Sequence, residues 1–218
     1  MIKDIDAFIF DMDGTLVDNM AIHTRLWVEY FAEMGITIDP RDFNQRTAGK
    51  TNPEVVRTVL GDDLSAAQLA EIGEEKERRF RAFFREHARP VAGLHALLAA
   101  ARQAGLKLGV ATSAPPENVT FKLGCLGLES FFDTVVHAGH IRNSKPHPEV
   151  FLTAAAQLGV PPERCLVFED ARIGVEGARR AGMPVIFVTT TLTAQEGTQI
   201  AGVIRAVTDF TQVMDLFT

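Results

Sequence analysis

The chain has 218 residues, of which 46% are hydrophobic and 23% are charged, a composition typical of folded globular proteins and not of disordered ones. Its 28 acidic and 22 basic residues give a net charge of −6, which disfavours nucleic acid and anionic membranes as partners. A small anionic ligand is compatible with this charge, because a metal ion and a few cations reverse the field locally.

The sequence shows no pattern typical of export or membrane insertion. The first residues lack the basic region and long apolar run of a signal peptide, and no stretch is long enough to span a bilayer. Cys125 and Cys165 are far apart and form no CxxC motif, so we expect two buried free thiols and no disulfide. These features favour a cytoplasmic protein.

Short apolar runs alternate with helical patterns along most of the chain. This alternation predicts an α/β fold, a doubly wound parallel sheet with helices on both faces. The predicted strands are 7–10, 106–111, 134–137, 166–168 and 185–188, and the predicted helices are 94–103, 116–126, 148–158 and 174–181.

One long segment interrupts the alternation. Helical patterns at 20–34, 53–60 and 66–86 follow one another with no strand between them. We interpret 18–89 as an all-helical cap domain inserted after the first strand, which leaves 1–17 and 90–218 as the core domain. The segments near Val17 and Arg89 are the expected hinges.

The strongest local pattern is a carboxylate pair directly after the first strand. In the stretch IDAFIFDMDGTLVDN, an apolar run leads into Asp11, and Asp13 follows two residues later. Residues i and i+2 of an extended chain face the same side, and ligands of open α/β sheets bind beyond the carboxyl ends of the strands. Two carboxylates this close need a cation between them or a shared proton. Both arrangements suit phosphoryl transfer.

An acidic pair of this kind also occurs in calcium loops and in ordinary acidic turns. A calcium loop of the EF-hand type needs Gly at its sixth position and Glu at its twelfth. Counted from Asp11, Gly14 is fourth and Ile22 is twelfth, so the EF-hand interpretation fails. An acidic turn without function stays open, although the preceding strand disfavours it.

Polar residues also follow three later strands. Thr112 and Ser113 follow the second strand. Lys145 follows the third strand in the stretch 144–148, which reads Ser-Lys-Pro-His-Pro, and the pair Glu169 and Asp170 follows the fourth strand. Each group alone has an ordinary explanation in turn chemistry, a surface lysine or a helix start. Together they supply the nucleophile, hydroxyl, cation and acids that a phosphoryl-transfer site needs.

These motifs resemble the haloacid dehalogenase (HAD) superfamily, and in particular its phosphatases and mutases similar to β-phosphoglucomutase. The resemblance covers nearly the whole chain and is carried by DMDGTLVDN, VATS, SKPHPEVF and VFEDARIGVEGARRAGM. It implies a HAD-like Rossmannoid core with a helical cap, and an enzyme that requires Mg²⁺.

The resemblance also implies roles for individual residues. Asp11 would attack phosphorus and form an aspartyl-phosphate, and Asp13 would protonate the leaving oxygen and then activate water. Thr112 and Lys145 would hold the transferring phosphoryl group. The Mg²⁺ ligands would be the Asp11 carboxylate, the Asp13 backbone carbonyl and Asp170, with Glu169 as a ligand or as an anchor for the site.

The cap is expected to choose the substrate. Asn19, His23 and Trp27 are four residues apart and share one helical stripe, which the resemblance places over the active site. It also implies that His23 assists Asp13 and that Lys76 meets the phosphate or the sugar. A packed histidine and a solvated lysine are the alternatives. With Lys50 and Ser113, the residues Asn19, His23 and Lys76 form the expected substrate-binding set.

Some positions depart from β-phosphoglucomutase. The cap-loop lysine and arginine of that enzyme align with Ala48 and Asn52, and its Ser-Lys-Asn aligns with the stretch 114–116, which reads Ala-Pro-Pro. Those family residues hold the second phosphate of a sugar bisphosphate; Arg46 or Lys50 could partly replace them.

We therefore expect a phosphatase for a small phosphomonoester such as a sugar or polyol phosphate, present as a monomer or weak homodimer. An intramolecular phosphomutase is the alternative, and a catalytically silent metabolite-binding protein is a third hypothesis. We treat His137 and His140 as structural because they lack metal-ligand spacing.

Overall fold

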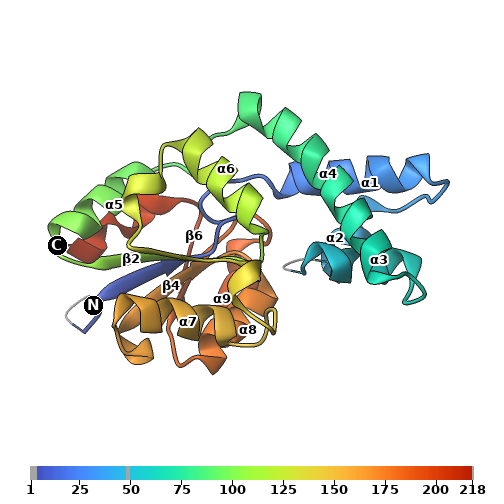
Figure 1. Ribbon diagram of the computed structural model, residues 1–218. Helices are drawn as coiled ribbons and strands as arrows, with labels where there is room; N and C mark the ends of the chain where they lie inside the picture. Colours follow the sequence, from blue (N-terminus) through green and yellow to red (C-terminus); the bar gives the residue numbers. More distant parts are fainter. Residues whose placement is uncertain (1–3, 48–49, 218) are drawn as a thin grey trace.

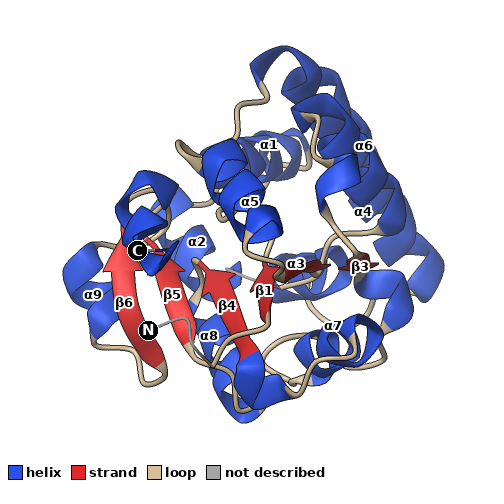
Figure 2. Ribbon diagram, turned by 90° about the vertical axis from the view of Figure 1, so that its left-hand side faces the viewer, coloured by secondary structure: helices blue, strands red, loops and turns tan. Residues whose placement is uncertain are grey.

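The computed structural model describes residues 4–47 and 50–217. Its centre is a parallel sheet of six strands in the order β3-β2-β1-β4-β5-β6, seen in Figure 2. The strands are β1 (Ala7–Phe10), β2 (Lys107–Ala111), β3 (Thr134–Val136), β4 (Cys165–Glu169), β5 (Val185–Val188) and β6 (Val203–Val207). From β1 the sheet grows in one direction to β3 and in the other to β6, so the order reverses between β1 and β4.

Helices cover both faces of the sheet, as Figure 1 shows. One face carries α5 (Leu94–Gln103), α6 (Pro116–Leu126) and the C-terminal 3₁₀ helix η4 (Phe210–Phe217), and the other carries α7 (Glu149–Leu158) and α8 (Arg172–Arg180). A short helix, α9 (Ala194–Thr198), connects β5 to β6. Single-turn 3₁₀ helices lie in the loops at η1 (Glu129–Phe131), η2 (Ala138–His140) and η3 (Pro162–Arg164).

The strand β1 explains how the two faces form. Its four residues are fully buried, and successive side chains point to opposite faces of a sheet. Phe8 and Phe10 belong to the hydrophobic cluster under α5 and α6, whereas Ala7 and Ile9 belong to the cluster over α7 and α8. A continuous apolar run is the expected sequence of a strand that is buried on both sides.

Four helices between β1 and α5 form a separate group, which we call the cap helices. They are α1 (Met20–Glu33), α2 (Pro40–Thr47), α3 (Asn52–Leu60) and α4 (Ala66–His87), and they lie beside the sheet in Figure 1. They have their own hydrophobic cluster, which includes Trp27, Phe31, Phe43 and Val56. The expected all-helical insertion is therefore present; its boundaries at 18–89 stay a prediction.

The two connections between the sheet and the cap helices run side by side. Val17 forms an antiparallel bridge with Pro90, and the Val91 amide donates a hydrogen bond to the Leu16 carbonyl at 3.0 Å. Both expected hinge segments therefore lie at one place in the molecule.

Several features differ from the expectation. The five predicted strands are present with ends shifted by one residue at most, but β6, α2, α9 and η4 were not predicted. The edge strand β6 is only partly buried and contains the exposed Ile204 next to Arg205, so its pattern lacks the continuous apolar run of a central strand. Cys165 is buried as expected, whereas Cys125 is exposed; both are free thiols.

Candidate active site

The predicted acids and the lysine gather where the strand order reverses. Asp11 follows β1, and its amide donates to the Phe168 carbonyl of the neighbouring β4 at 3.0 Å. Thr112 and Asp170 follow β2 and β4, and all three side chains are at least nine-tenths buried. They line a cleft of about 960 Å³ between the sheet and the cap helices.

Lys145 connects two of these acids. Its Nζ donates to Asp11 Oδ1 at 2.6 Å and to Glu169 Oε1 at 2.7 Å, and it lies 4.9 Å from the centre of the Phe151 ring. Burial would lower the pKa of Lys145, but Asp11 and Glu169 outweigh burial and raise it. The lysine is therefore a permanent cation beside the predicted nucleophile.

Glu169 is held on both of its oxygens. While Oε1 accepts from Lys145, Oε2 accepts from the amides of Asp170 and Ala171 at 2.8 and 2.7 Å. Helix α8 leaves room for this carboxylate only because residue 174 is glycine, since a Cβ there would lie 1.7 Å from Oε1. Of the two predicted roles, these contacts favour Glu169 as an anchor of the site.

Asp170 approaches the turn after β1 closely. Its Oδ1 accepts a hydrogen bond from Thr15 Oγ1 at 3.2 Å, so the turn after β1 is bonded to the acid that follows β4. Gly14 has a φ of +87°, and a Cβ on it would lie 2.1 Å from Asp170 Oδ2. Only glycine allows both this backbone conformation and this close approach.

The electrostatics of the cluster favour a bound cation. Burial raises the pKa of Asp11 to about 7, with a further increase from Glu169 and Asp13, although Lys145 opposes it. Burial, Glu169 and Asp11 likewise raise the pKa of Asp170 well above its ordinary value. These shifts describe a metal-free cluster, in which nearby carboxylates resist ionising together.

The donor set fits a hard divalent cation such as Mg²⁺. Mg²⁺ prefers oxygen ligands and binds through one or two carboxylates, with waters or phosphates completing its shell. Asp11 and Asp170 could supply the carboxylates and the Asp13 backbone a carbonyl oxygen. No cluster of three or more His, Cys, Asp or Glu side chains arranged for a metal occurs in the described part of the chain.

Asp13 points its carboxylate at a lysine that we did not predict. Lys122 Nζ donates to Asp13 Oδ1 at 2.5 Å and to Oδ2 at 2.6 Å, and Asn19 Nδ2 donates to Oδ1 at 2.5 Å. Burial would raise the pKa of Asp13, but Lys122 and His23 outweigh it and lower the pKa well below its ordinary value. The predicted acid/base residue is thus held as a carboxylate by a cation.

The helical pattern of α6 contains the signal that would have identified Lys122. Val119, Leu123 and Leu126 are buried on one stripe of the helix, and Lys122 occupies the same stripe, three residues after Val119. A lysine among apolar stripe positions is buried only when it finds a partner.

His23 and Lys76 extend the polar network into the cap helices. Lys76 Nζ lies 2.9 Å from His23 Nδ1 and 2.5 Å from Glu77 Oε1. Because an ammonium group only donates, Nδ1 accepts and the ring proton sits on Nε2, which is 3.5 Å from Asp13 Oδ1. Burial, together with Lys76, lowers the pKa of His23 to about 4. His23 is therefore a neutral neighbour of Asp13.

Lys76 is not a solvated surface lysine: it lines the cleft, and its ammonium group contacts His23 and Glu77. It is 1% exposed and lies 5.2 Å from the centre of the Trp27 ring. Its partner Glu77 also accepts from Asn52 Nδ2 at 2.8 Å and from Asn118 of α6. Burial would raise the pKa of Glu77, but Lys76 and the neighbouring cations lower it to about 2.

Two residues with hydroxyl groups, Thr112 and Ser113, line the cleft after β2. Thr112 Oγ1 accepts from the Ala114 amide at 3.1 Å, which orients it after β2. Ser113 Oγ is buried without a hydrogen-bond partner among the described residues, and Ser113 lines the cleft. A buried hydroxyl without a partner is costly, so a ligand oxygen at this point would satisfy it.

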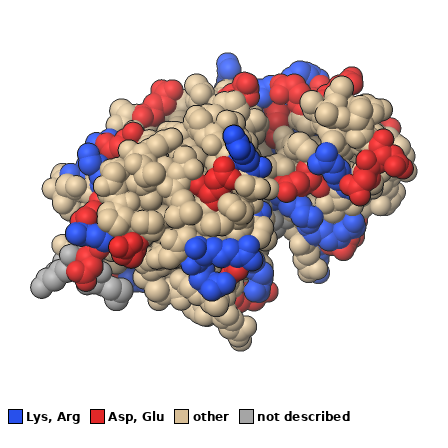
Figure 3. Space-filling model, turned by 60° about the horizontal axis from the view of Figure 1, so that its bottom comes forward, with Lys and Arg blue, Asp and Glu red and all other residues tan. Residues whose placement is uncertain are grey.

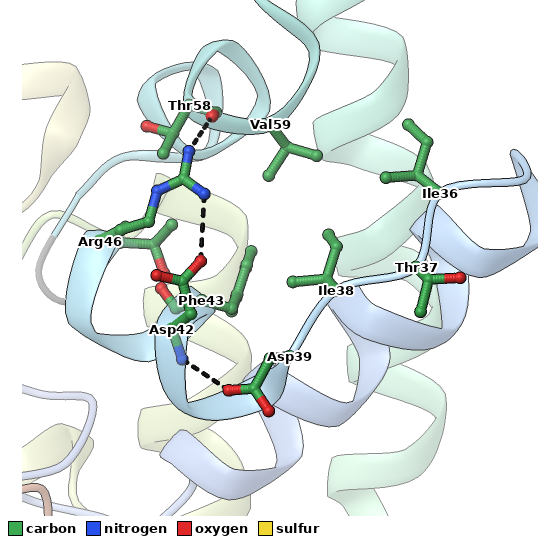
Figure 4. A pocket seen from close by; sticks show the side chains of 10 residues that line it. Ile36, Thr37, Ile38, Asp39, Asp42, Phe43, Arg46, Thr58 and Val59 are labelled. Carbon is green, nitrogen blue, oxygen red and sulfur yellow. Dashed lines mark hydrogen bonds and ion pairs between the residues drawn. The ribbon is translucent and has the colours of Figure 1, made fainter.

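Of the two cations that could replace the missing phosphate ligands, Lys50 faces the cleft and Arg46 does not. Lys50 lines the cleft, with Nζ 3.0 Å from Thr58 Oγ1. Arg46 instead points to a pocket of about 200 Å³ inside the cap helices, where it donates to Asp42 Oδ2 at 3.1 Å and to the Thr58 carbonyl at 2.8 Å (Figure 4). Arg46 therefore does not replace the missing phosphate ligand in this arrangement. Ala48 lies outside the described residues.

The remaining expectations concern the surface. The rings of His137 and His140 stack at 3.7 Å, and His137 Nδ1 accepts from the Gly139 amide at 3.1 Å, so they shape a turn.

Acidic and basic side chains are interspersed on the face in Figure 3. Among the helices that the structure describes, none has the length and apolar character needed to cross a bilayer.

Comparison with known proteins gives consistent matches. The sequence model of haloacid dehalogenase-like hydrolases matches residues 5–182. A phosphorylated carbohydrates phosphatase from Thermotoga maritima is 31% identical over 188 residues, covering 84% of each chain. A β-phosphoglucomutase structure from Clostridium difficile superposes with a TM-score of 0.86 at 28% identity, covering 98% of this chain and 95% of that one.

A longer plant protein also contains a similar segment. Protein SUPPRESSOR OF QUENCHING 1, chloroplastic, from Arabidopsis thaliana is 36% identical over 199 residues. The match covers 86% of this chain but only 18% of the plant protein.

Proposed function

The chain belongs to the haloacid dehalogenase-like hydrolase family, and from this premise we propose that it is a Mg²⁺-dependent phosphatase for a small sugar or polyol phosphate. Hydrolysis would proceed through an aspartyl-phosphate on Asp11. The relative from Thermotoga maritima, named for activity on phosphorylated carbohydrates, supports the substrate class.

One observation carries the proposal: the balance of charges around Asp11. Arg41, Lys50, Arg172 and Glu196 also line the cleft, but they are exposed. The hydrogen-bonded network around Asp11 contains the carboxylates of Asp11, Asp13, Glu77, Glu169 and Asp170 and the ammonium groups of Lys76, Lys122 and Lys145. When all are ionised, two negative charges are left over, which one divalent cation balances. Mg²⁺ would also neutralise the phosphate that must approach an anionic nucleophile.

In the first half of the reaction, an Asp11 carboxylate oxygen attacks phosphorus and the bond to the substrate's ester oxygen breaks. The electron pair of that bond goes to the departing oxygen. Asp13, a carboxylate in the ligand-free arrangement, takes up a proton from water as the anionic substrate binds and gives this proton to the departing oxygen. Lys145 and the Ser113 hydroxyl are placed at the cleft to stabilise charge on the phosphoryl oxygens.

In the second half, water attacks phosphorus and gives a proton to Asp13, while Asp11 leaves as a carboxylate. Inorganic phosphate is released and both acids return to their starting states. A covalent intermediate replaces one difficult displacement with two easier ones. Closed cap helices would keep bulk water out of the cleft while the phosphoryl group moves to Asp11.

Phosphomutase activity is the second candidate, favoured by the structural similarity to β-phosphoglucomutase. A mutase must hold the second phosphate of a bisphosphate intermediate while the molecule turns around. Here Arg46 is engaged elsewhere, and Pro115 and Pro116 lack amide donors at the corresponding loop. Of the two candidate replacements, Lys50 lines the cleft and Arg46 does not. These features favour hydrolysis.

Phosphate release separates the candidates. The protein is incubated with a panel of sugar, polyol and nucleotide monophosphates, with and without Mg²⁺. We expect Mg²⁺-dependent phosphate release from sugar or polyol phosphates. Conversion of a hexose 1-phosphate to the 6-phosphate with a trace of bisphosphate would instead identify a mutase. Failure to turn over any monoester would support the silent binding protein.

Two further expectations accompany this function and stay predictions. We expect the enzyme to act in the cytoplasm, and we expect it to be a monomer or a weak homodimer. We also propose 18–89 as a cap domain that moves relative to 1–17 and 90–218.

A further inference from the structure

Lys122 is a fully buried lysine on a core helix. It lies on α6, its side chain is 0% exposed, and apolar residues of the same helix surround it along the stripe. Removing an ammonium group from water costs several kcal/mol unless a charged partner compensates. Its ion-pair partner is Asp13, 109 positions earlier in the chain.

The contact involves both carboxylate oxygens of Asp13. With Nζ at 2.5 Å from Oδ1 and 2.6 Å from Oδ2, the lysine restricts the direction in which this carboxylate points. Asn19 adds a third hydrogen bond at 2.5 Å. His23 Nε2 is 3.5 Å from Asp13 Oδ1, but the neutral ring adds no charge. Lys122 is therefore the cation that balances Asp13.

The cap helices complete the surroundings of Lys122. Its Nζ lies 4.7 Å from the centre of the Phe80 ring on α4, and Phe80 also stacks on His23 at 4.1 Å. One turn before Lys122, the Asn118 side chain donates to Glu77 of α4. Helix α6 thus contacts the acid/base residue and the cap helices through one face.

We propose that Lys122 is a positioning residue for proton transfer: from α6, its fully buried ammonium group fixes the direction of the Asp13 carboxylate, which is 20% exposed to the cleft. This inference rests on the proposed function, because it assigns a role in the same reaction. Although Lys122 lines the cleft, both hydrogen bonds of its ammonium group among the described residues go to Asp13, so we expect its effect to pass through Asp13.

The proposal predicts that the leaving group decides the size of the effect. An alkoxide leaving group needs the proton of Asp13, whereas p-nitrophenolate is stable enough to leave without one. General acid–base catalysis contributes about 10²–10⁴-fold. If the Asp13 carboxylate loses its fixed orientation, release of a sugar or polyol leaving group therefore slows, whereas release of p-nitrophenolate does not.

The experiment compares Lys122→Met and Lys122→Arg with the wild type in single-turnover reactions. We expect Lys122→Met to slow release of the sugar or polyol by about 10²-fold and the p-nitrophenolate burst by less than about threefold, with KM changed by less than about threefold. Lys122→Arg keeps a cation that can contact both oxygens and should recover about tenfold over Met. Thermal unfolding verifies that both variants fold.

One control variant tests whether the effect is specific to Lys122. Lys107→Met removes an exposed lysine at the start of β2 and should leave both rates unchanged. Equal slowing of both leaving groups by Lys122→Met, or no slowing of either, would overturn the proposal.

A second measurement does not depend on turnover. Crystal structures with Mg²⁺ and trifluoroberyllate should show the Asp13 side chain in one orientation in the wild type and in another in Lys122→Met. An unchanged Asp13 orientation would also overturn the inference. A wild-type protein that releases no phosphate from any monoester would instead refute the proposed function.

Discussion

Asp11 and Asp18 are carboxylates in the same loop region, but only Asp11 is buried at the strand end. We predict that Asp11→Asn lowers phosphate release by at least about 10³-fold, because an amide cannot serve as the nucleophile. The protein should remain folded, since one of several repelling carboxylates is removed. Asp18→Asn, which changes an exposed acid, should retain wild-type turnover. Full activity in Asp11→Asn would refute the proposed nucleophile.

The raised pKa of Asp11 makes the stability of the metal-free protein depend on pH. In the fold this pKa is about 7, against an ordinary value of 3.8, so the folded protein holds a proton that the unfolded chain releases. The stability from this group is fully present below pH 3.8 and is lost as the pH rises through about 7. Without metal, we therefore predict that the melting temperature of the wild type falls as the pH rises from about 4 to about 7. In Asp11→Asn, which lacks this titrating group, the fall should be smaller.

Magnesium should reverse this trend, because it binds the ionised carboxylates and competes with protons. At 100 times its Kd, a ligand of the folded state adds about 2.7 kcal/mol of stability. Thermal unfolding at pH 5 and pH 8 should show the larger Mg²⁺ shift at pH 8. Two results would contradict the assignment of the raised pKa to Asp11. One is an equal Mg²⁺-induced change in melting temperature at pH 5 and pH 8. The other is a pH dependence of the metal-free melting temperature that is the same in Asp11→Asn as in the wild type.

At the scale of an element, the close packing of helix α8 against Glu169 requires a glycine at position 174. Gly→Ala within a helix ordinarily stabilises it by up to about 1 kcal/mol, but a Cβ on Gly174 would lie 1.7 Å from Glu169 Oε1. We predict that Gly174→Ala displaces Glu169 from Lys145 and lowers kcat/KM by at least about tenfold, with a lower melting temperature.

Gly124 provides the matched control for this substitution. It lies within α6, and a Cβ there would meet Glu129 at 3.5 Å, an ordinary contact. Gly124→Ala should keep wild-type kcat/KM and equal or raise the melting temperature. If Gly174→Ala behaved in the same way, the close fit of α8 against Glu169 would be wrong.

At the scale of the whole molecule, the cap helices and the core meet through polar contacts on two sides of the cleft. Ser144 Oγ donates to Glu54 Oε1 of α3 at 2.8 Å, and Asn118 donates to Glu77 of α4. Bonds of this kind contribute about 0.5–1.5 kcal/mol each, so if the cap moves as proposed, we expect them to stabilise the arrangement seen here without preventing opening.

We predict that Ser144→Ala raises KM by about two- to tenfold, because up to about 1.4 kcal/mol of closure is lost and this amount corresponds to a factor of ten. The melting temperature should change little. Steady-state kinetics on the best sugar phosphate provide the measurement. Ser130→Ala, at an exposed serine, is the control and should leave KM unchanged.

The fold class was largely readable from local patterns. Buried parallel strands such as β1 and β5 are continuous apolar runs, which a short window of sequence reveals. The edge strand β6 has exposed and buried residues mixed together. It was missed because its place is set by pairing with β5, and pairing is a contact between distant segments.

The residues at the strand ends show the same division. Asp11, Lys145 and Glu169 were predicted to meet, and the structure joins them through two bonds of Lys145. Their catalytic and metal-binding roles stay predictions. Thr15 lies in the turn directly after the strand of Asp11, but its hydroxyl bonds to Asp170, 155 positions away, and no local pattern reveals such a contact.

The sequence alone determined that apolar strands end in acids, a hydroxyl and a lysine, because side-chain alternation and strand ends are local properties of the chain. Only the tertiary structure decided that Lys122 pairs with Asp13, 109 positions earlier, and that the neighbouring Lys76 and Glu77 are buried together against α6. The physical reason is that burial makes an unpaired charge costly. Which partner is available depends on how α6 and α4 pack against the sheet, and no short stretch of sequence contains that information.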